Sequence, residues 1–287
     1  MKQFSFYSPT SLAEALDLLE QHGPVASPLA GGTDLLVQMR QGKRRPGALI
    51  SLRRLPELRG IDQAPDSAWH IGASTTLRQL TREPAIRRRY PSLAHTASLM
   101  ASEQVRSLAT LGGNLCNGSP AADLAPPLIA LGAEVLLRGP QGERLLPLET
   151  FFLGPGSTAL QPGELLIEVI VPPPEGHCVY MKHAARAYMD IPIVGVAARL
   201  SMQDGEVGEA RIVLGAVAPT PLRARAAERL LEGRPLTRAR IQEAAELAQQ
   251  DCSAISDVRA SQDYRRRLVR VLAERALQAF GLNGGDA

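Results

Sequence analysis

The sequence predicts an α+β protein with two domains, and three observations support this fold class. A chain of 287 residues is long for one domain and comfortable for two. Strand and helix patterns are mixed up to Pro172–Pro174, a run that breaks regular elements and that we predict to be the domain boundary. After this run, three strand patterns precede three helix patterns, the order of an α+β domain. We therefore expect one domain at residues 1–174 and a second at residues 175–287.

Residues 1–56, approximately, have the pattern of a small βαβ-like subdomain. Ser11-Leu-Ala-Glu14 is a capping box that opens an amphipathic helix, and Gly23 ends this helix. A short strand is expected next, followed by a helix start at Thr33–Met39. A second short strand is expected at Ala48–Leu52.

A second subdomain is expected at about residues 57–174. Thr110–Asp123 is rich in turn-forming residues, and Gly139–Gly142 separates the two strands of a predicted hairpin, Ala133–Arg138 and Glu143–Pro147. The other elements predicted here are helices at Thr76–Leu80, Pro91–Met100 and Pro126–Leu131 and a strand at Leu165–Val171.

The C-terminal domain is predicted to be a three-stranded antiparallel sheet followed by a three-helix bundle. Asp204-Gly205 is the expected turn between the second and third strands. The tail Asn283–Ala287 is predicted to be loose. The predicted strands are Cys178–His183, Ile193–Ser201 and Val207–Val217, and the predicted helices are 222–232, 238–250 and 261–280.

Charge and aromatic content argue against a nucleic-acid-binding protein. The net charge is only +3, and the five Phe, five Tyr and one Trp are too few for a platform that stacks bases. Basic clusters lie at Lys43–Arg45, Arg87–Arg89 and Arg265–Arg267. We interpret them as solvated surface charge or as a docking face for another protein.

The cysteines and the apolar stretches of the sequence indicate where the protein is located and which metal centres it can hold. Three cysteines cannot hold a four-cysteine iron–sulfur cluster, and they allow one disulfide at most. The N-terminus lacks the apolar stretch of a signal peptide, and the longest apolar-looking run, 125–137, is too short to span a bilayer. We therefore predict a cytoplasmic protein without a membrane span. His177, Cys178 and His183 fit no zinc spacing, so no metal site is predicted.

Two glycine pairs are the most informative local features. They lie in Leu29-Ala-Gly-Gly-Thr-Asp34 and in Thr110-Leu-Gly-Gly-Asn114, each at the end of an apolar stretch. Glycine lets the backbone approach a ligand closely, and exposed N–H groups in such turns bind anions. Together the two segments could hold the two phosphates of a dinucleotide from opposite sides. The alternative is two ordinary tight turns, and neither segment is a Walker or a Rossmann motif.

A family resemblance favours the ligand-binding interpretation. Ala30–Leu36 and the twenty-residue segment Gln104–Asp123 resemble the FAD-binding medium subunit of the molybdenum hydroxylases, the xanthine dehydrogenase and carbon monoxide dehydrogenase family. Tyr180–Lys182, followed by Arg186 and Asp190, is similar to the start of that family's C-terminal domain. The resemblance covers essentially the whole chain, and bacterial xanthine dehydrogenase FAD subunits are the nearest form.

The resemblance implies a fold and a cofactor site. The fold is a PCMH/vanillyl-alcohol-oxidase-like FAD-binding domain of two α/β subdomains, and FAD is bound non-covalently. Asp123 is implied to bond the sugar–phosphate part, Leu166 to contact the flavin through its backbone, and Lys182 to lie at the flavin end. Met100 stands where animal xanthine dehydrogenases place an aromatic residue. The implied contact residues are Ser27, Pro28, Leu29, Ala30, Gly31, Gly32, Thr33, Asp34, Leu35, Met100, Thr110, Leu111, Gly112, Gly113, Asn114, Asn117, Ser119, Asp123, Leu166 and Lys182.

Simpler roles remain open for several of these residues. Asp34 and Asp123 each precede a predicted helix and could cap it. Lys182 could be a surface lysine, and Cys116 a small buried filler. Glu103 and Arg106 could pair with each other at the surface.

The function implied by the resemblance is electron transfer by an FAD-carrying subunit. Electrons from substrate hydroxylation on a large molybdenum subunit would pass through [2Fe–2S] clusters on a small subunit to this FAD and then to NAD or another acceptor. Molybdopterin and the [2Fe–2S] clusters are thus expected on partner subunits, in a dimer of heterotrimers, and no side chain of this chain is predicted to be catalytic. Two alternatives are a self-contained flavin oxidoreductase with its own substrate and a non-catalytic docking subunit.

Overall fold

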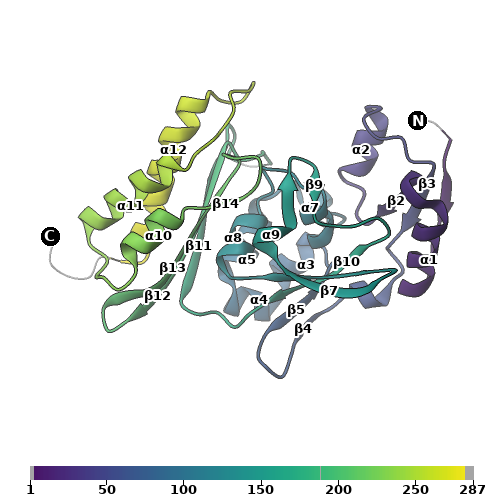
Figure 1. Cartoon of the computed structure of the whole chain (residues 1–287), viewed down its shortest axis with the longest axis horizontal. Coiled ribbons are helices and arrows are strands. Elements are labelled where there is room, and N and C mark those ends of the chain that lie inside the picture. Colours follow the sequence, from purple (N-terminus) through teal and green to yellow (C-terminus); the bar gives the residue numbers. More distant parts are fainter. Residues whose placement is uncertain (1–2, 188, 282–287) are drawn as a thin grey trace.

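A computed structural model describes residues 3–187 and 189–281. Three larger sheets follow one another along the long axis of the molecule, with the N-terminal sheet at one end and the C-terminal helices at the other (Figure 1). The predicted α+β class is confirmed in this mixed arrangement of helices and strands. The tail 283–287, predicted to be loose, lies outside the described residues.

The first sheet is small and entirely parallel, with the order β1-β3-β2. The predicted helix between its first two strands is present as α1, capped by the Ser11 hydroxyl, which accepts a hydrogen bond from the Glu14 N–H. Helix α1 buries Leu12, Ala15 and Leu19 against this sheet. The elements are β1 (Ser5–Tyr7), α1 (Leu12–His22), the short 3-10 helix η1 (Gly23–Val25), β2 (Ala26–Leu29), α2 (Leu35–Arg40) and β3 (Ala48–Ser51).

The second sheet lies in the middle of the molecule, in the order β4-β5-β10-β6-β7 with antiparallel neighbours. The predicted hairpin is present as β6 and β7. The strands are β4 (Ile61–Gln63), β5 (Trp69–Gly72), β6 (Glu134–Gly139), β7 (Gly142–Pro147) and β10 (Leu165–Val171), with β8 (Phe152–Gly154) and β9 (Ser157–Thr158) as a separate pair. The helices are η2 (Pro56–Leu58), α3 (Leu77–Arg82), α4 (Pro84–Arg89), α5 (Pro91–Leu99), α6 (Glu103–Arg106), α7 (Leu111–Cys116), α8 (Ala125–Ala130) and α9 (Leu148–Phe151).

The second glycine pair is helical, which corrects the turn-rich prediction for this region. Thr110 is the N-cap of α7, and its hydroxyl accepts a hydrogen bond from the Gly113 N–H at 3.0 Å. Two glycines in a six-residue helix lower its intrinsic propensity, so the sequence pattern concealed it. Backbone hydrogen bonds from Leu111 to Thr75 and from Gly112 to Ala73 anchor its first turn to the chain after β5.

The third sheet has four strands, not the predicted three. The added strand β14 (Leu222–Arg223) pairs with β13 inside the range predicted as helix 222–232, and the helix α10 begins only at Arg225. Pairing with β13 decides the conformation of so short a segment, and local periodicity cannot show it. The remaining elements agree closely with the predicted ones: β11 (His177–His183), β12 (Val194–Gln203), β13 (Glu206–Gly215), α10 (Arg225–Leu231), α11 (Arg238–Gln250) and α12 (Gln262–Gln278).

The two faces of the third sheet have different partners. Val196, Ala198 and Ile212 belong to the apolar core that the sheet shares with α10, α11 and α12. Ala197 and Val213, on the other face, belong with Tyr180 to the core of the middle sheet. The C-terminal sheet therefore packs against the middle part of the chain, where helix α8 contacts β11, β12 and β13.

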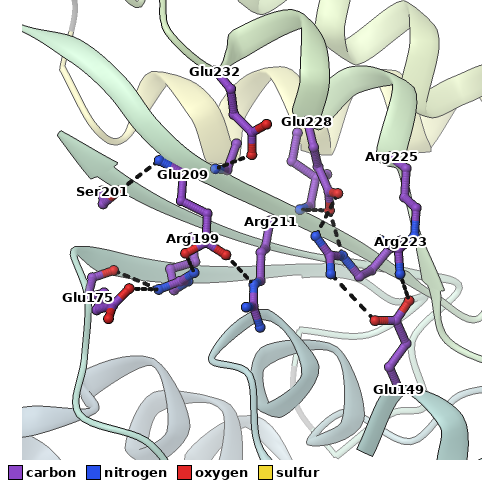
Figure 2. Close-up of polar contacts among 12 residues, drawn as sticks. Glu149, Glu175, Arg199, Ser201, Glu209, Arg211, Arg223, Arg225, Glu228 and Glu232 are labelled. Atoms are coloured by element: carbon purple, nitrogen blue, oxygen red, sulfur yellow. Dashed lines mark hydrogen bonds and ion pairs between the residues drawn. The ribbon is translucent and has the colours of Figure 1, made fainter. Parts of the chain in front are cut away.

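Arginines border this apolar contact on β12, β13 and β14. Figure 2 shows Arg199 and Arg211 converging on Glu209, and Glu149 reaching from α9 to Arg223 and Arg225. Arg223 also binds Glu228 through two hydrogen bonds of 3.0 and 2.8 Å, and both side chains are nearly buried. These ion pairs tie β14 to α10 on one side and to α9 on the other.

One of the basic clusters predicted to be solvated is not fully so. Arg265 is buried, donates to the Ile193 carbonyl at 2.6 Å and pairs with Asp257 at 2.8 Å. Arg266 and Arg267 are exposed, in agreement with the prediction. In the ranges that the structure describes, no helix is long and apolar enough to cross a membrane.

Replacing Glu228 by alanine tests the buried pair. The substitution leaves the Ile212 N–H without its acceptor and the Arg223 guanidinium with Glu149 alone, so we expect the free energy of unfolding to fall by about 3 kcal/mol. Glu246→Ala removes an exposed pair with Arg270 and is the control, with an expected loss below about 0.5 kcal/mol. Urea denaturation of the full chain measures both values, and equal losses would contradict the assignment.

Candidate functional site

A cavity of about 510 Å³ lies between the first and second sheets. Both glycine segments line it, together with residues of α2, α7, β10 and the stretch after β11. Its volume is within the range of roughly 300–1,000 Å³ that is usual for small-molecule sites. The two motifs that sequence analysis singled out, some eighty residues apart, are therefore brought together in one site.

Gly31 touches the chain directly before the second glycine segment, at Leu108 and Ala109. A Cβ on this residue would lie 2.1 Å from the Leu108 carbonyl oxygen, closer than any side chain can approach backbone. Only glycine fits this contact. Gly112 is similarly constrained, because a Cβ there would meet the Ala73 Cβ at 2.7 Å.

The first segment offers free backbone donors to the cavity. Gly32 has a left-handed backbone with φ 71°, and Gly32, Thr33 and Asp34 all line the cavity. Their N–H groups donate no hydrogen bond to the part of the chain that the structure describes. Unbonded N–H groups around a left-handed residue make a concave binding surface for an anion.

The second segment does not offer such donors, which corrects the prediction that both segments bind phosphate through N–H groups. The N–H groups of Leu111, Gly112 and Gly113 are bonded to Thr75, Ala73 and Thr110, because the first turn of α7 is packed onto the chain after β5. The segment supplies instead a surface without side chains at Gly112 and Gly113. It also supplies Asn114, whose buried Oδ1 has no partner among the described residues.

Side-chain contacts fix the walls around these segments. Gln38 on α2 donates to the Asn117 side chain at the end of α7 at 3.2 Å, which joins the two helices across the site. Arg106 donates to the carbonyls of Met100 at 2.6 Å and Ala101 at 2.7 Å. It also pairs with Glu103 at 3.0 Å, as the sequence suggested.

All but four of the predicted contact residues line the cavity. Of the four, Leu29 is paired with Ser51 in the first sheet, and Leu111 is buried in the middle core. Asp123 and Lys182 lie behind the wall. The residues that do line it are Ser27, Pro28, Ala30, Gly31, Gly32, Thr33, Asp34, Leu35, Met100, Thr110, Gly112, Gly113, Asn114, Asn117, Ser119 and Leu166.

Asp123 is the centre of a buried polar cluster. Its carboxylate accepts from the Tyr180 hydroxyl at 2.8 Å and pairs with the Lys182 ammonium at 3.3 Å. Burial raises the pKa of the Asp123 carboxyl, and the Lys182 charge opposes that rise. Lys182 also donates to the carbonyls of Asp190 at 3.1 Å and Leu99 at 3.4 Å, so the cluster holds the start of the C-terminal sheet against the cavity wall.

Asp34 occupies the N-cap position of α2 without acting as a cap. Its side chain makes no capping hydrogen bond, and burial around its carboxyl raises the pKa of this group. Asp34 lines the cavity, so its carboxyl is available to a ligand hydroxyl.

Sequence reasoning missed several lining residues. Gln38 had no signal beyond its place on a predicted helix. Arg44 lies in a basic cluster that was interpreted as surface charge, yet it lines the cavity. Met189 and Ile191 lie beyond the predicted domain boundary, and only the resemblance around Asp190 could have indicated that this stretch returns to the site.

Burial makes Cys116 an unreactive lining residue, because it raises the pKa of its thiol to about 12. Within residues 3–187 and 189–281, no group of three or more His, Cys, Asp or Glu side chains is placed to hold a metal ion.

Two family models account for nearly the whole chain. Residues 2–174 match the FAD binding domain in molybdopterin dehydrogenase. Residues 179–280 match the CO dehydrogenase flavoprotein C-terminal domain. The chain belongs to this family of FAD-binding oxidoreductase subunits. The resemblance noted in the sequence and the prediction of FAD as cofactor are thereby confirmed.

Relatives of this flavoprotein family match over the full length. The xanthine dehydrogenase FAD-binding subunit of Escherichia coli O157:H7 is 35% identical over 285 residues, covering 98% of this chain and 97% of its own. The carbon monoxide dehydrogenase medium chain of Hydrogenophaga pseudoflava is 36% identical over 278 residues, covering 96% of each chain. A solved structure of the Hydrogenophaga pseudoflava carbon monoxide dehydrogenase superimposes with a TM-score of 0.94 at 37% identity, covering 97% of both chains.

Gly31→Ala tests whether the contact between the glycine segments builds the flavoprotein's site. The new methyl group would push against the Leu108 carbonyl and separate the two segments, so we expect FAD affinity to fall at least tenfold. Gly154→Ala is the control, because a Cβ there meets no atom within 4 Å. Flavin fluorescence during titration of the FAD-free protein measures the affinity, and unchanged binding by Gly31→Ala would contradict this account.

Lys182→Met tests the buried cluster through its pH dependence. Without Lys182, the pKa of the buried Asp123 carboxyl rises further above its unfolded value, so folding increasingly favours the protonated form. Loss of the hydrogen bonds to the Asp190 and Leu99 carbonyls lowers stability equally at all pH values. The part of the loss due to Asp123 should be small near pH 4 and grow as pH rises through the folded pKa, to about 3 kcal/mol. Urea midpoints at pH 4.5 and 7.5 measure it. A loss that is equal at both pH values, or larger at pH 4.5, would show that Asp123 is not the group responsible.

Proposed function

We propose that this chain holds FAD non-covalently in the 510 Å³ cavity and passes electrons from the [2Fe–2S] clusters of a partner subunit to NAD or another acceptor. The observation that carries the proposal is the pairing, in one cavity, of free N–H groups at Gly32–Asp34 with the side-chain-free surface at Gly112 and Gly113. Such a site combines anion binding with close approach of a flat or extended ligand to the backbone.

The residues present fit FAD. The N–H groups of Gly32, Thr33 and Asp34, with Arg44 at the rim, would hold the pyrophosphate. The buried Oδ1 of Asn114, which has no partner among the described residues, would accept a hydrogen bond from the cofactor. Met100 and Leu166 offer apolar surface. Asp123 and Lys182, predicted as direct contacts, would instead act from behind by fixing Asp190 and Leu99.

Two ionisable lining groups, Cys116 and Glu164, are not set up for acid–base chemistry on a resident substrate. Asp34 also lines the cavity, and we assign its carboxyl to a ligand hydroxyl. The Cys116 thiol stays protonated, because burial raises its pKa to about 12. Glu164 is held by Arg144 at 2.7 Å, which keeps the pKa of the carboxyl below its usual value. When bound, FAD supplies one- and two-electron transfer, and the chain's task is to bind and orient it. This weighs against a self-contained flavin oxidoreductase.

The relatives support the proposed assembly. One is a "medium chain" of carbon monoxide dehydrogenase, a name that fits a subunit between a larger and a smaller one. We propose a large molybdopterin subunit and a small [2Fe–2S] subunit as partners, in a dimer of heterotrimers. The two family models support a domain boundary between residues 174 and 175, because one match ends at residue 174 and the next begins at residue 179. A cytoplasmic location stays a prediction.

The complex purified with its partner subunits tests this proposal. Under anaerobic conditions, its hydroxylation substrate should bleach both the iron–sulfur and the flavin absorbance, and an added acceptor should restore them. The same complex carrying Gly31→Ala should bleach at the iron–sulfur bands only and lose acceptor reduction.

Two outcomes of that experiment favour the alternatives. Flavin reduction in the isolated chain by a small substrate, without partners, would favour a self-contained oxidoreductase. Acceptor reduction that is unchanged by Gly31→Ala, in a complex that has lost its flavin absorbance, would favour a docking subunit.

A further inference from the structure

A second cavity, of about 420 Å³, lies among α5, β11 and α12. It is distinct from the flavin cavity, and the two share no lining residue. Side chains from three separate parts of the chain converge on it: His95 from α5, His183 from β11 and Arg275 from α12, with Arg186 just after β11.

The described side chains that line this cavity include positively charged groups but no negatively charged ones. The basic side chains of the described lining are Lys182, Arg186, Arg275, His95 and His183. No Asp or Glu belongs to the described lining. Lys182 itself is neutralised, because it is paired with Asp123 and donates to the Asp190 and Leu99 carbonyls. The positive charge of the wall therefore comes from Arg186 and Arg275, and His95 and His183 add two imidazoles.

Both arginines are available to a ligand. Arg275 is exposed and makes no ion pair with any residue in the described ranges. Arg186 is 75% exposed, and its Nε lies 3.6 Å from Asp190, a contact too exposed to hold it strongly. A guanidinium group in such a position binds phosphate oxygens through two parallel hydrogen bonds.

We propose that this second cavity binds a phosphorylated small molecule of about the size of a mononucleotide. The volume falls within the usual range for small ligands, and the described lining supplies two guanidinium groups and two imidazoles but no carboxylate of its own. The nearby groups that compete with a ligand are Asp190, which pairs with Arg186, and the Tyr264 hydroxyl, which lies 3.3 Å from the His183 Nε2. Ordinary surface charge, by contrast, intersperses both signs.

The position of the cavity connects it with the flavin site. Leu99 lines the second cavity, and the next residue, Met100, lines the flavin cavity. Likewise, Arg186 lines the second cavity, and its ion-pair partner Asp190 lines the flavin cavity. Lys182 holds both walls through their carbonyls. A phosphorylated electron acceptor bound here would lie within one layer of residues from the flavin. This last link rests on the proposed function, whereas anion binding does not.

Histidine NMR spectra of the full chain test the binding directly. The chain has five histidines, of which only His95 and His183 line this cavity and none lines the flavin cavity. Titration with inorganic pyrophosphate should shift the ring signals of His95 and His183 saturably and leave those of His22, His70 and His177 in place. Signals are assigned with single His→Gln variants. No shift, or uniform shifts of all five signals, would overturn the proposal.

Arginine variants complete the test. Arg275→Gln and Arg186→Gln should each weaken pyrophosphate binding roughly tenfold when it is followed through the remaining His95 and His183 signals, the loss expected for a charge-assisted hydrogen bond. Arg266→Gln is the matched control. Arg266 is exposed on the same helix, about two and a half turns before Arg275 and therefore on the opposite face. Equal weakening by Arg266→Gln would mean non-specific attraction and would overturn the site.

A nucleotide comparison separates free phosphate from a phosphorylated nucleoside as the ligand. With the chain saturated with FAD, ADP should shift the same two histidine signals and adenosine should not. Tighter binding of ADP than of pyrophosphate would identify a nucleotide as the ligand, and the reverse would identify a simple phosphate. Adenosine binding as tightly as ADP would contradict a phosphate site. Because the pyrophosphate titration needs no FAD, a failure of FAD binding would not be mistaken for a failure here.

Discussion

The contact between Gly31 and the Leu108 carbonyl is the constraint on which the flavin cavity depends. The cavity is built from two sheets that share no strand. Its walls meet at this contact, at the Gln38–Asn117 hydrogen bond, and in the apolar core that Ile50 shares with Leu165 and Ile167. The first glycine turn is held by this backbone contact and by the hydrogen bonds that the Gly32 and Asp34 carbonyls accept from Leu36 and Gln38, so it uses none of its own N–H groups. The N–H groups of Gly32, Thr33 and Asp34 are thus left for a ligand.

A second constraint fixes the C-terminal part of the chain to this site. Asp123 follows the second glycine segment, and through Tyr180 and Lys182 it holds the strand β11. The apolar contact of Ala197 and Val213 with the middle core, bordered by ion pairs such as Arg223–Glu149 (Figure 2), prevents this sheet from turning about that point. As a result, Met189 and Ile191 can form part of the flavin cavity although they lie beyond the predicted domain boundary.

Sequence reasoning went furthest where one local signal decides the structure. The cap at Ser11, the left-handed turn at Asp204-Gly205 and the strand Leu165–Val171 follow from residue type and periodicity alone. Predictions from the sequence failed where contacts with a distant segment of the chain determine the local structure. The helix at Leu111–Cys116 and the strand at Leu222–Arg223 exist because of bonds to distant segments, and the positions of Asp123 and Lys182 behind the wall depend on burial that no motif encodes.

Amide hydrogen exchange, followed residue by residue with and without FAD, tests the central claim that only the first glycine segment binds the cofactor through backbone N–H groups. The account predicts that FAD slows exchange at Gly32, Thr33 and Asp34, which are unbonded in the protein alone. It predicts little change at Leu111–Gly113, whose N–H groups already have partners. Unchanged exchange at residues 32–34 in the FAD-loaded protein, with slowing at residues 111–113 instead, would contradict it.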